Sequence, residues 1–185
     1  MEKFSEKVFL QLKMPMEEVP LSDEKRIRLA LETLGYAHVN IPLSVMRKLY
    51  PLCRDAGFDI TVSLVRRETD WAMVSVEAGD TTKEHYGIAV DYGSTTIVME
   101  LVDMNSGAVI DQVKAVNGQT VYGTDILTRI TFAKEDPANA EQLQKATVKT
   151  FDSLLEQLTE NTGIDAAKCP VMILSGNTTM IHFLL

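Results

Sequence analysis

The residues best suited to chemistry lie together in the segment IAVDYGSTTIVMELVD. An apolar strand carries one carboxylate, Asp91, to its end, and the chain then turns at Gly93. Such a glycine turn can point consecutive backbone N–H groups into one anion-binding concavity. The hydroxyls of Ser94, Thr95 and Thr96 add neutral donors. Because Mg²⁺ binds one or two carboxylates together with water and phosphate oxygens, an acid beside this turn favours a magnesium–phosphate site at Asp91.

A polar hairpin turn that binds no ligand is the alternative interpretation of this segment. Glycine, serine and aspartate are ordinary turn residues in proteins of every function. The chain contains no GxxxxGK[ST] segment, so a phosphate loop of the Walker type is excluded.

A second polar segment, SGNTTM, follows the apolar run at residues 171–177. The ends of such strands face ligand crevices in open α/β sheets, so Gly176, Asn177 and Thr178 are candidates for ligand contact. Asparagine cannot act as a general base, which argues against a sugar kinase with its catalytic acid at this position. The alternative is that Asn177 or Thr178 caps the following helix.

A third segment, YGTDILTRI, places Asp125 and Arg129 four residues apart, so the two can share a helix face and pair. Two interpretations stay open. One is a surface ion pair worth about 0.5 kcal/mol or less. The other is a role near a nucleotide or at a dimer interface.

The elements that must position these segments are predicted from hydrophobic period and turn residues. Three strands in an antiparallel meander, two helices and a last strand are expected at residues 86–93, 96–104, 108–116, 120–134, 137–162 and 171–177. Asp136 and Pro137 suit the start of the second helix and Gly163 its end. Its predicted core positions are Leu143, Val148, Phe151, Leu155 and Leu158. The last strand is wholly apolar, as a buried parallel strand would be.

The first part of the chain reads as a small sheet backed by two helices. Strands are expected at residues 7–13, 58–67 and 71–79, and helices at 24–34 and 40–57. Ser22 and Asp23 suit the start of the first helix and Gly35 its end. Pro51 should kink or break the second helix, whose predicted core residues are Ile41, Leu43, Val45, Met46, Leu49 and Leu52. A polar break at residues 78–85 divides the chain into predicted domains at 1–82 and 86–185.

The bulk composition of the 185 residues excludes several classes of protein. A net charge of −8 argues against nucleic-acid binding, and the basic spot around Arg26 is expected to be solvated surface beside acids. Cys53 and Cys169 form no CxxC or cysteine–histidine cluster, so both are expected to be packing residues in a reducing cytoplasm. No apolar run reaches the length of a membrane helix. The apolar ending IHFLL suggests a piece of a longer protein.

The motif DYGSTT resembles the first phosphate loop of the actin, hexokinase and Hsp70 superfamily. Together with NGQTVYGTDILTRI and ILSGNTTMIHFLL, in that order, it looks like the ATPase domain of the reductive activators of corrinoid proteins. The resemblance implies an α/β fold: a small α/β middle domain, followed by the first half of an actin-like (ribonuclease H-like) ATPase domain with a mixed sheet.

The resemblance also implies roles for single residues. Asp91 would position Mg²⁺ through water, and Gly93, Ser94, Thr95 and Thr96 would hold the β- and γ-phosphates of ATP. The loop of Gly176, Asn177 and Thr178 would contact phosphate-bound water. Tyr92 stands where the family has a small or aliphatic residue, which is expected to alter packing only.

The same resemblance implies a corrinoid protein as partner, a homodimer, and a [2Fe–2S] cluster carried outside these residues. The second phosphate loop and the adenosine-binding segment are also expected elsewhere, so weak ATP affinity is predicted for this chain alone. The alternatives are another actin-like ATPase or small-molecule kinase, and a non-catalytic dimerisation or scaffold fragment.

Overall fold

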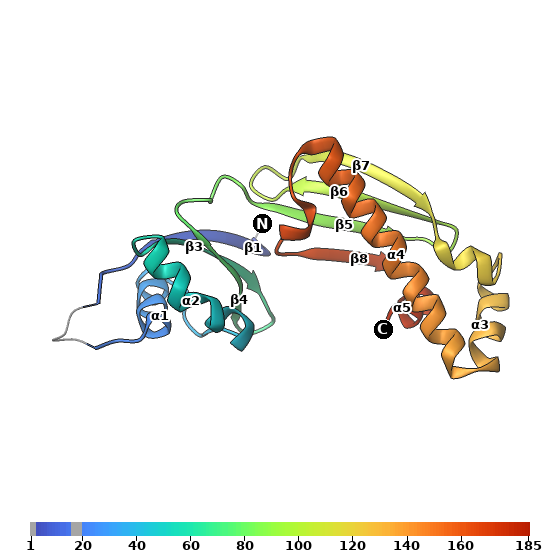
Figure 1. The fold of residues 1–185 in the computed structure, drawn as a ribbon, viewed down its shortest axis with the longest axis horizontal. Helices are drawn as coiled ribbons and strands as arrows, with labels where there is room; N and C mark the ends of the chain where they lie inside the picture. The colour runs from blue at the N-terminus through green and yellow to red at the C-terminus, as the bar shows by residue number, and fades with distance from the viewer. Residues whose placement is uncertain (1–2, 16–19) are drawn as a thin grey trace. The chain divides into compact units, whose positions relative to one another are not determined.

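The computed structural model describes residues 3–15 and 20–185. These form two compact units, Met1–His85 and Tyr86–Leu185, and each is described by itself (Figure 1). Each unit holds one four-stranded sheet with both parallel and antiparallel pairs. The predicted α/β class with a mixed sheet is therefore confirmed.

The first unit is a sheet with two helices, as predicted, and with one additional short strand. Its elements are β1 (Ser5–Gln11), α1 (Asp23–Thr33), β2 (Val39–Asn40), α2 (Leu43–Asp55), β3 (Asp59–Arg66) and β4 (Trp71–Ala78). The strand order is β1-β3-β4-β2, in which β2 alone runs parallel to its neighbour. The Ser22 side chain caps α1 and Gly35 follows its end with φ +93°, both as predicted.

Helix α2 differs from the prediction at the proline and on its exposed side. The helix runs unbroken from Leu43 to Asp55 through Pro51, because one exposed turn can lose a hydrogen bond while the rest of the helix stays packed. Val45, Leu49 and Cys53 form its buried face at spacings of four residues. That spacing leaves two predicted core residues outside: Leu43 is 61% exposed and Met46 38% exposed.

Cys53 has the packing role that the sequence predicts. Its thiol is fully buried in the core of the first unit, and that burial raises its pKa. A thiolate, the form that binds metals, is therefore disfavoured there.

The polar segment before the second unit packs onto the sheet of the first. The Thr61 hydroxyl donates to the carbonyl of Gly79 (2.6 Å), and the backbone N–H of Thr81 donates to the Thr61 oxygen (3.0 Å). The buried ring of His85 lies 3.0 Å from the Ser5 hydroxyl. Hydrogen bonds with β1 and β3 thus fix this stretch, which the sequence presents only as a polar break.

The second unit contains the three-strand meander and the long helix that the sequence predicts. Its elements are β5 (Tyr86–Tyr92), β6 (Thr96–Asp103), β7 (Val109–Val116), the 3₁₀ helix η1 (Gly118–Tyr122), α3 (Ile126–Glu135), α4 (Pro137–Thr162), the 3₁₀ helix η2 (Ala166–Lys168), β8 (Met172–Gly176) and α5 (Thr178–Leu184). The strand order is β7-β6-β5-β8, with α4 lying along the sheet (Figure 1).

Helix α4 has the predicted ends, with Asp136 as its N-cap and Gly163 in the left-handed conformation after it. Its buried residues recur every three or four positions, which excludes the predicted core residue Val148, 44% exposed, from the buried stripe. The buried residues are Leu143, Thr147, Phe151, Leu154 and Leu158.

Strand β8 is parallel to β5, as predicted, but it is not buried. Met172 is 43% exposed and Ile173 53% exposed. The cause is position: β8 is the last strand in the order, and no described strand pairs with its outer edge. An apolar run can therefore be an edge strand, which its composition alone does not reveal.

The helix predicted at residues 120–134 is two elements. Asn117 caps the 3₁₀ helix η1, which ends at Tyr122 with Gly123 as its C-cap, and α3 begins at Ile126 with Asp125 as its N-cap. The side chains of Asp125 and Thr128 each bond the other's backbone N–H, a reciprocal arrangement that fixes the new start.

Tyr36 gives the first unit a testable dependence on alkaline pH. Burial, then the hydrogen bond to Glu6 and the charge of Glu6, raise the pKa of Tyr36 to about 12. Since the unfolded pKa is about 10, this stabilisation is complete below pH 10 and is lost as pH rises towards 12. We expect the unfolding free energy of the parent to fall more steeply above about pH 10 than that of Tyr36→Phe. Chemical denaturation at stepped pH measures the difference.

Tyr50→Phe is the matched control, since Tyr50 is 67% exposed in the same unit. Parallel pH profiles for the parent and Tyr36→Phe would contradict the assignment of this pKa.

Candidate functional site

Parallel pairing of β5 with β8 brings two of the sequence-predicted segments side by side. Asp91 is the register partner of Ser175, and Tyr92 is the register partner of Gly176. The turn after β5 and the turn after β8 therefore lie at the same end of the sheet. The hairpin of residues 91–96 and the loop of residues 176–178 are neighbours in space, although about eighty positions separate them along the chain.

The hairpin has a close backbone approach at Gly93. A Cβ at Gly93 would lie 2.3 Å from the carbonyl oxygen of Thr96, so no other residue fits without moving the turn. Gly176 is also confined, since its Cβ would lie 3.1 Å from the Tyr92 carbonyl oxygen. Around this tight backbone, Ser94 is half-buried, whereas Asp91, Thr95 and Thr96 are exposed.

Asp91 also borders an open hollow of about 450 Å³ on the sheet. Asp91 and Glu100 alternate with residues that pack into the core under α4, so both lie on the other face. The hollow is lined by Ala89, Val90, Asp91, Val98, Glu100, Gln112, Ile173 and Ser175.

The described residues contain no group of three or more histidine, cysteine, aspartate or glutamate side chains that could hold a metal ion. A Mg²⁺ at Asp91 would thus take its other ligands from water and phosphate, which is the coordination this ion prefers. The exposed carboxylate beside exposed hydroxyls fits that donor set.

Asn177 occupies the helix-capping position that the sequence offered as an alternative. Its side-chain oxygen accepts a hydrogen bond from the backbone N–H of Met180 (3.0 Å) and so begins α5. Gly176, Asn177 and Thr178 are all exposed. Contact between this loop and a nucleotide stays a prediction.

The interpretation of Asp125 and Arg129 as a surface ion pair is wrong. Arg129 is fully buried, with its Nε donating to the carbonyl of Gly123 (2.8 Å) and its Nη1 lying 3.4 Å from the Gln119 side-chain oxygen. The Asp125 carboxylate accepts a hydrogen bond from the Thr128 N–H and so caps α3. Burial lowers the pKa of Arg129 and outweighs the electrostatic effects of Tyr92 and Asp125, which act to raise it. Its Nη2 finds no hydrogen-bond partner among the described residues.

Asn117 and Gln119 are the residues that the sequence reasoning missed. Both are fully buried directly behind the hairpin. The Asn117 side-chain amide donates to the carbonyl of Gly93 (2.9 Å), and its backbone N–H donates to the carbonyl of Thr95 (2.8 Å). A signal was present in the segment NGQTVYG, where two amide side chains follow immediately after an expected strand.

Tyr92 faces the interior, on the side opposite to Asp91. Its ring meets that of Phe151 edge-on, with centroids 5.5 Å apart. Its hydroxyl lies 2.6 Å from the Thr147 hydroxyl and 3.1 Å from the Gln119 amide nitrogen. The unusual residue of the motif is thus a core residue that joins the hairpin to α4, as the expectation of altered packing implied.

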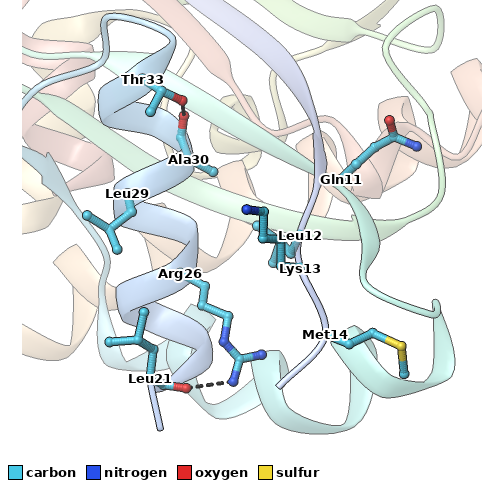
Figure 2. A pocket seen from close by; sticks show the side chains of 9 residues that line it. All are labelled: Gln11, Leu12, Lys13, Met14, Leu21, Arg26, Leu29, Ala30 and Thr33. Atoms are coloured by element: carbon cyan, nitrogen blue, oxygen red, sulfur yellow. Dashed lines mark hydrogen bonds between the residues drawn. The ribbon is translucent and has the colours of Figure 1, made fainter. Parts of the chain in front are cut away.

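The first unit has a hollow of its own, of about 540 Å³, shown in Figure 2. Arg26 projects into it and donates to the carbonyl of Leu21. Its side chain is only 11% exposed and lies 3.6 Å from Asp23, so this basic residue is not the solvated surface charge that was expected. The lining is mainly apolar and includes none of the predicted nucleotide residues. The hollow is lined by Gln11, Leu12, Lys13, Met14, Leu21, Arg26, Leu29, Ala30 and Thr33.

The second unit is therefore an α/β unit with a mixed sheet and a glycine hairpin at the end of its inner strand β5. The family described as RACo middle region matches residues 86–185, which is more than half of the chain, and the family described as RACo linker region matches residues 1–83. The chain belongs to the family of reductive activators of corrinoid proteins.

Two known proteins extend this result. The corrinoid activation enzyme RamQ of Eubacterium limosum is 31% identical over 110 residues, which cover 60% of this chain and 18% of RamQ. A solved structure of a reductive activator for a corrinoid, iron-sulfur protein superposes with a TM-score of 0.81 at 28% identity. That match covers 98% of this chain and 29% of the solved chain, so the chain spans less than a third of either relative.

Within the described ranges, no helix combines the length and the apolar character that crossing a membrane requires.

Replacing Gly93 by alanine tests the steric constraint on the hairpin. The added Cβ must displace the Thr96 carbonyl, so we expect the second unit to lose about 1–3 kcal/mol of unfolding free energy. Amide NMR signals of residues 93–96 should shift as well. Gly107→Ala is the control for the NMR signals: no atom lies within 4 Å of its Cβ position, and its φ of +78° strains an alanine in another turn, so it should cost stability without shifting the signals of residues 93–96. A Gly93→Ala chain with unshifted hairpin signals would show that the close approach is absent.

Proposed function

We propose that this chain is part of an ATP-dependent reductive activator, which restores the cobalt centre of a corrinoid protein by electron transfer coupled to ATP hydrolysis. The observation that carries the proposal is the convergence of the hairpin after β5 and the loop after β8 in a chain of this family. The arrangement of meander, helices and parallel strand also fits the first half of an actin-like domain. On this proposal, the hairpin after β5 and the loop after β8 form one wall of a nucleotide site, and the other wall lies outside these residues.

The hairpin supplies the groups that a Mg²⁺-bound triphosphate needs. Asp91 would hold Mg²⁺ through water, and the backbone and hydroxyls of residues 93–96 would receive the β- and γ-phosphates. Mg²⁺, when bound, would neutralise charge on the phosphate oxygens. Exposed Thr95 and Thr96 can donate hydrogen bonds outward, because the carbonyl side of the hairpin is held from within the unit.

The loop of residues 176–178 would complete this wall beside the phosphates. Asn177 favours an activator over a small-molecule kinase, since an amide cannot deprotonate a substrate hydroxyl. Its oxygen is also engaged in the cap of α5. Its exposed position beside the hairpin suits contact with phosphate-bound water.

The electron would come from a [2Fe–2S] cluster outside these residues. Cys53 and Cys169 are poor candidates for cluster ligands, because Cys53 is buried in the core of the first unit and the half-buried Cys169 packs against the core of the second. The partner would be a corrinoid protein. A homodimer and a cytoplasmic location complete the proposal.

The carboxylate at the hairpin is tested by Asp91→Ala in the full-length protein. We expect ATP turnover and corrinoid reduction to fall together by about a hundredfold or more, as when one preorganised electrostatic group is removed from a phosphoryl-transfer site. Steady-state turnover and the cobalt absorbance change measure the two activities.

Glu100→Ala is the matched control for that experiment, because Glu100 lies on the same sheet face but outside the hairpin. Unchanged turnover in Asp91→Ala would remove the phosphate-loop assignment and favour a scaffold role. A phosphorylated small molecule among the products would favour a kinase.

Nucleotide affinity of the 185-residue chain alone gives a second test. We expect Mg-ATP to bind weakly or not at all, because one wall of the site provides only part of the contacts. Isothermal titration measures this directly, and saturable binding in the micromolar range would contradict the division of the site between two halves.

A further inference from the structure

We infer that Asn117 is a positioning residue that sets the shape of the phosphate hairpin from its buried side. The inference rests on the proposed function and adds a residue that the predicted site lacked. Asn117 contacts the hairpin through two groups of its own, and both of its contacts are to backbone carbonyls of the turn, those of Gly93 and Thr95.

The two hydrogen bonds determine which backbone groups face outward. The carbonyls of Gly93 and Thr95 point inward to Asn117, at 2.9 and 2.8 Å. Carbonyl oxygens repel phosphate, so holding two of them inside leaves the outer side of the turn to N–H and hydroxyl donors. A relaxed hairpin, free to turn a carbonyl outward, would bind an anion less well.

Asn117 can hold the hairpin because it is itself fixed. It is fully buried, and its side-chain oxygen accepts from the backbone N–H of Gln119 (2.9 Å), which caps η1. Gly118 lies so close to α4 that a Cβ there would meet the Ala146 carbonyl oxygen at 2.8 Å. The 3₁₀ helix η1 therefore packs closely against α4, which restricts its movement.

The Gln119 side chain fastens the same turn to three further groups. Its amide nitrogen lies 2.8 Å from the Thr147 hydroxyl and 3.1 Å from both the Leu143 carbonyl and the Tyr92 hydroxyl. On its oxygen side is the Arg129 guanidinium, whose Nη1 also lies 3.8 Å from the Met180 sulfur of α5. The hairpin, η1, α4 and α5 thus share one buried polar network.

Asn117→Ser separates positioning from helix capping. Serine is a good N-cap and can still accept from the Gln119 N–H, but its side chain is too short to reach the Gly93 carbonyl. In the full-length protein we expect the Kd for Mg-ATP to rise about three- to tenfold, the effect of losing one hydrogen bond. Exchange of the backbone N–H at position 117, which bonds the Thr95 carbonyl, should also be faster in the 185-residue variant than in the parent. If Asn117 served only to cap η1, the serine variant would bind Mg-ATP with the affinity of the parent.

Asp136→Ala is the matched control, because it removes an N-cap of α4 in the same unit without touching the hairpin. It should lower stability and leave the Kd for Mg-ATP unchanged. If Asp91→Ala abolishes turnover while Asn117→Ser binds Mg-ATP like the parent, the positioning role is wrong and the proposed function stands. If Asp91→Ala leaves turnover unchanged and Asn117→Ser leaves the Kd for Mg-ATP unchanged, the proposed function is contradicted, and the positioning role that rests on it is contradicted as well.

Asn117→Asp provides an independent test that does not depend on the folding of the serine variant. It keeps the acceptor for Gln119 but places an oxygen opposite the Gly93 carbonyl. Burial raises the pKa of such a carboxyl, and only its protonated form can donate to Gly93. We expect its Mg-ATP affinity, relative to the parent at each pH, to recover as pH falls from about 8 to about 6. Parent-like affinity of Asn117→Asp at every pH would overturn the inference, because the hydrogen bond to the Gly93 carbonyl would then have no effect on binding.

Discussion

The parallel pairing of β5 with β8 is the constraint on which the second unit depends. Parallel neighbours cannot be joined by a tight turn, so the chain must leave the sheet and return after a long crossover. Here the crossover contains β6, β7, η1, α3 and α4. Closing such a long connection costs conformational entropy, and α4 offsets this cost by burying one apolar stripe against the sheet. The result is that two polar turns, encoded far apart, emerge at one end of the sheet.

The hairpin at that end has two sides with different chemistry. Its outer side presents Asp91 and the hydroxyls, which are exposed. Its inner side is held by buried amides and by the Tyr92 hydroxyl. Polar groups buried in this way must be hydrogen-bonded or they cost stability, and once bonded they fix one arrangement. A loop that must hold a phosphate in one place is well served by that rigidity.

Arg129 shows the same logic with a charge. A buried guanidinium is costly when, as here, no described residue forms a salt bridge with it, but the Arg129 side chain bonds the Gly123 carbonyl and approaches Gln119. Its position between η1 and α5 joins the two segments that flank the proposed nucleotide wall.

Local patterns in the sequence determined most of the elements. The meander, the caps of α1 and α4, and the glycines after them follow from hydrophobic period and turn chemistry, which act within a few residues. The same local chemistry identified the hairpin as an anion-binding candidate.

Tertiary structure decided what depends on neighbours distant in sequence. It made β8 an exposed edge, left Val148 outside the core, and allowed α2 to continue through Pro51. It also buried Arg129 and placed Asn117 behind the hairpin, because which polar residues meet in a core depends on how the chain returns on itself.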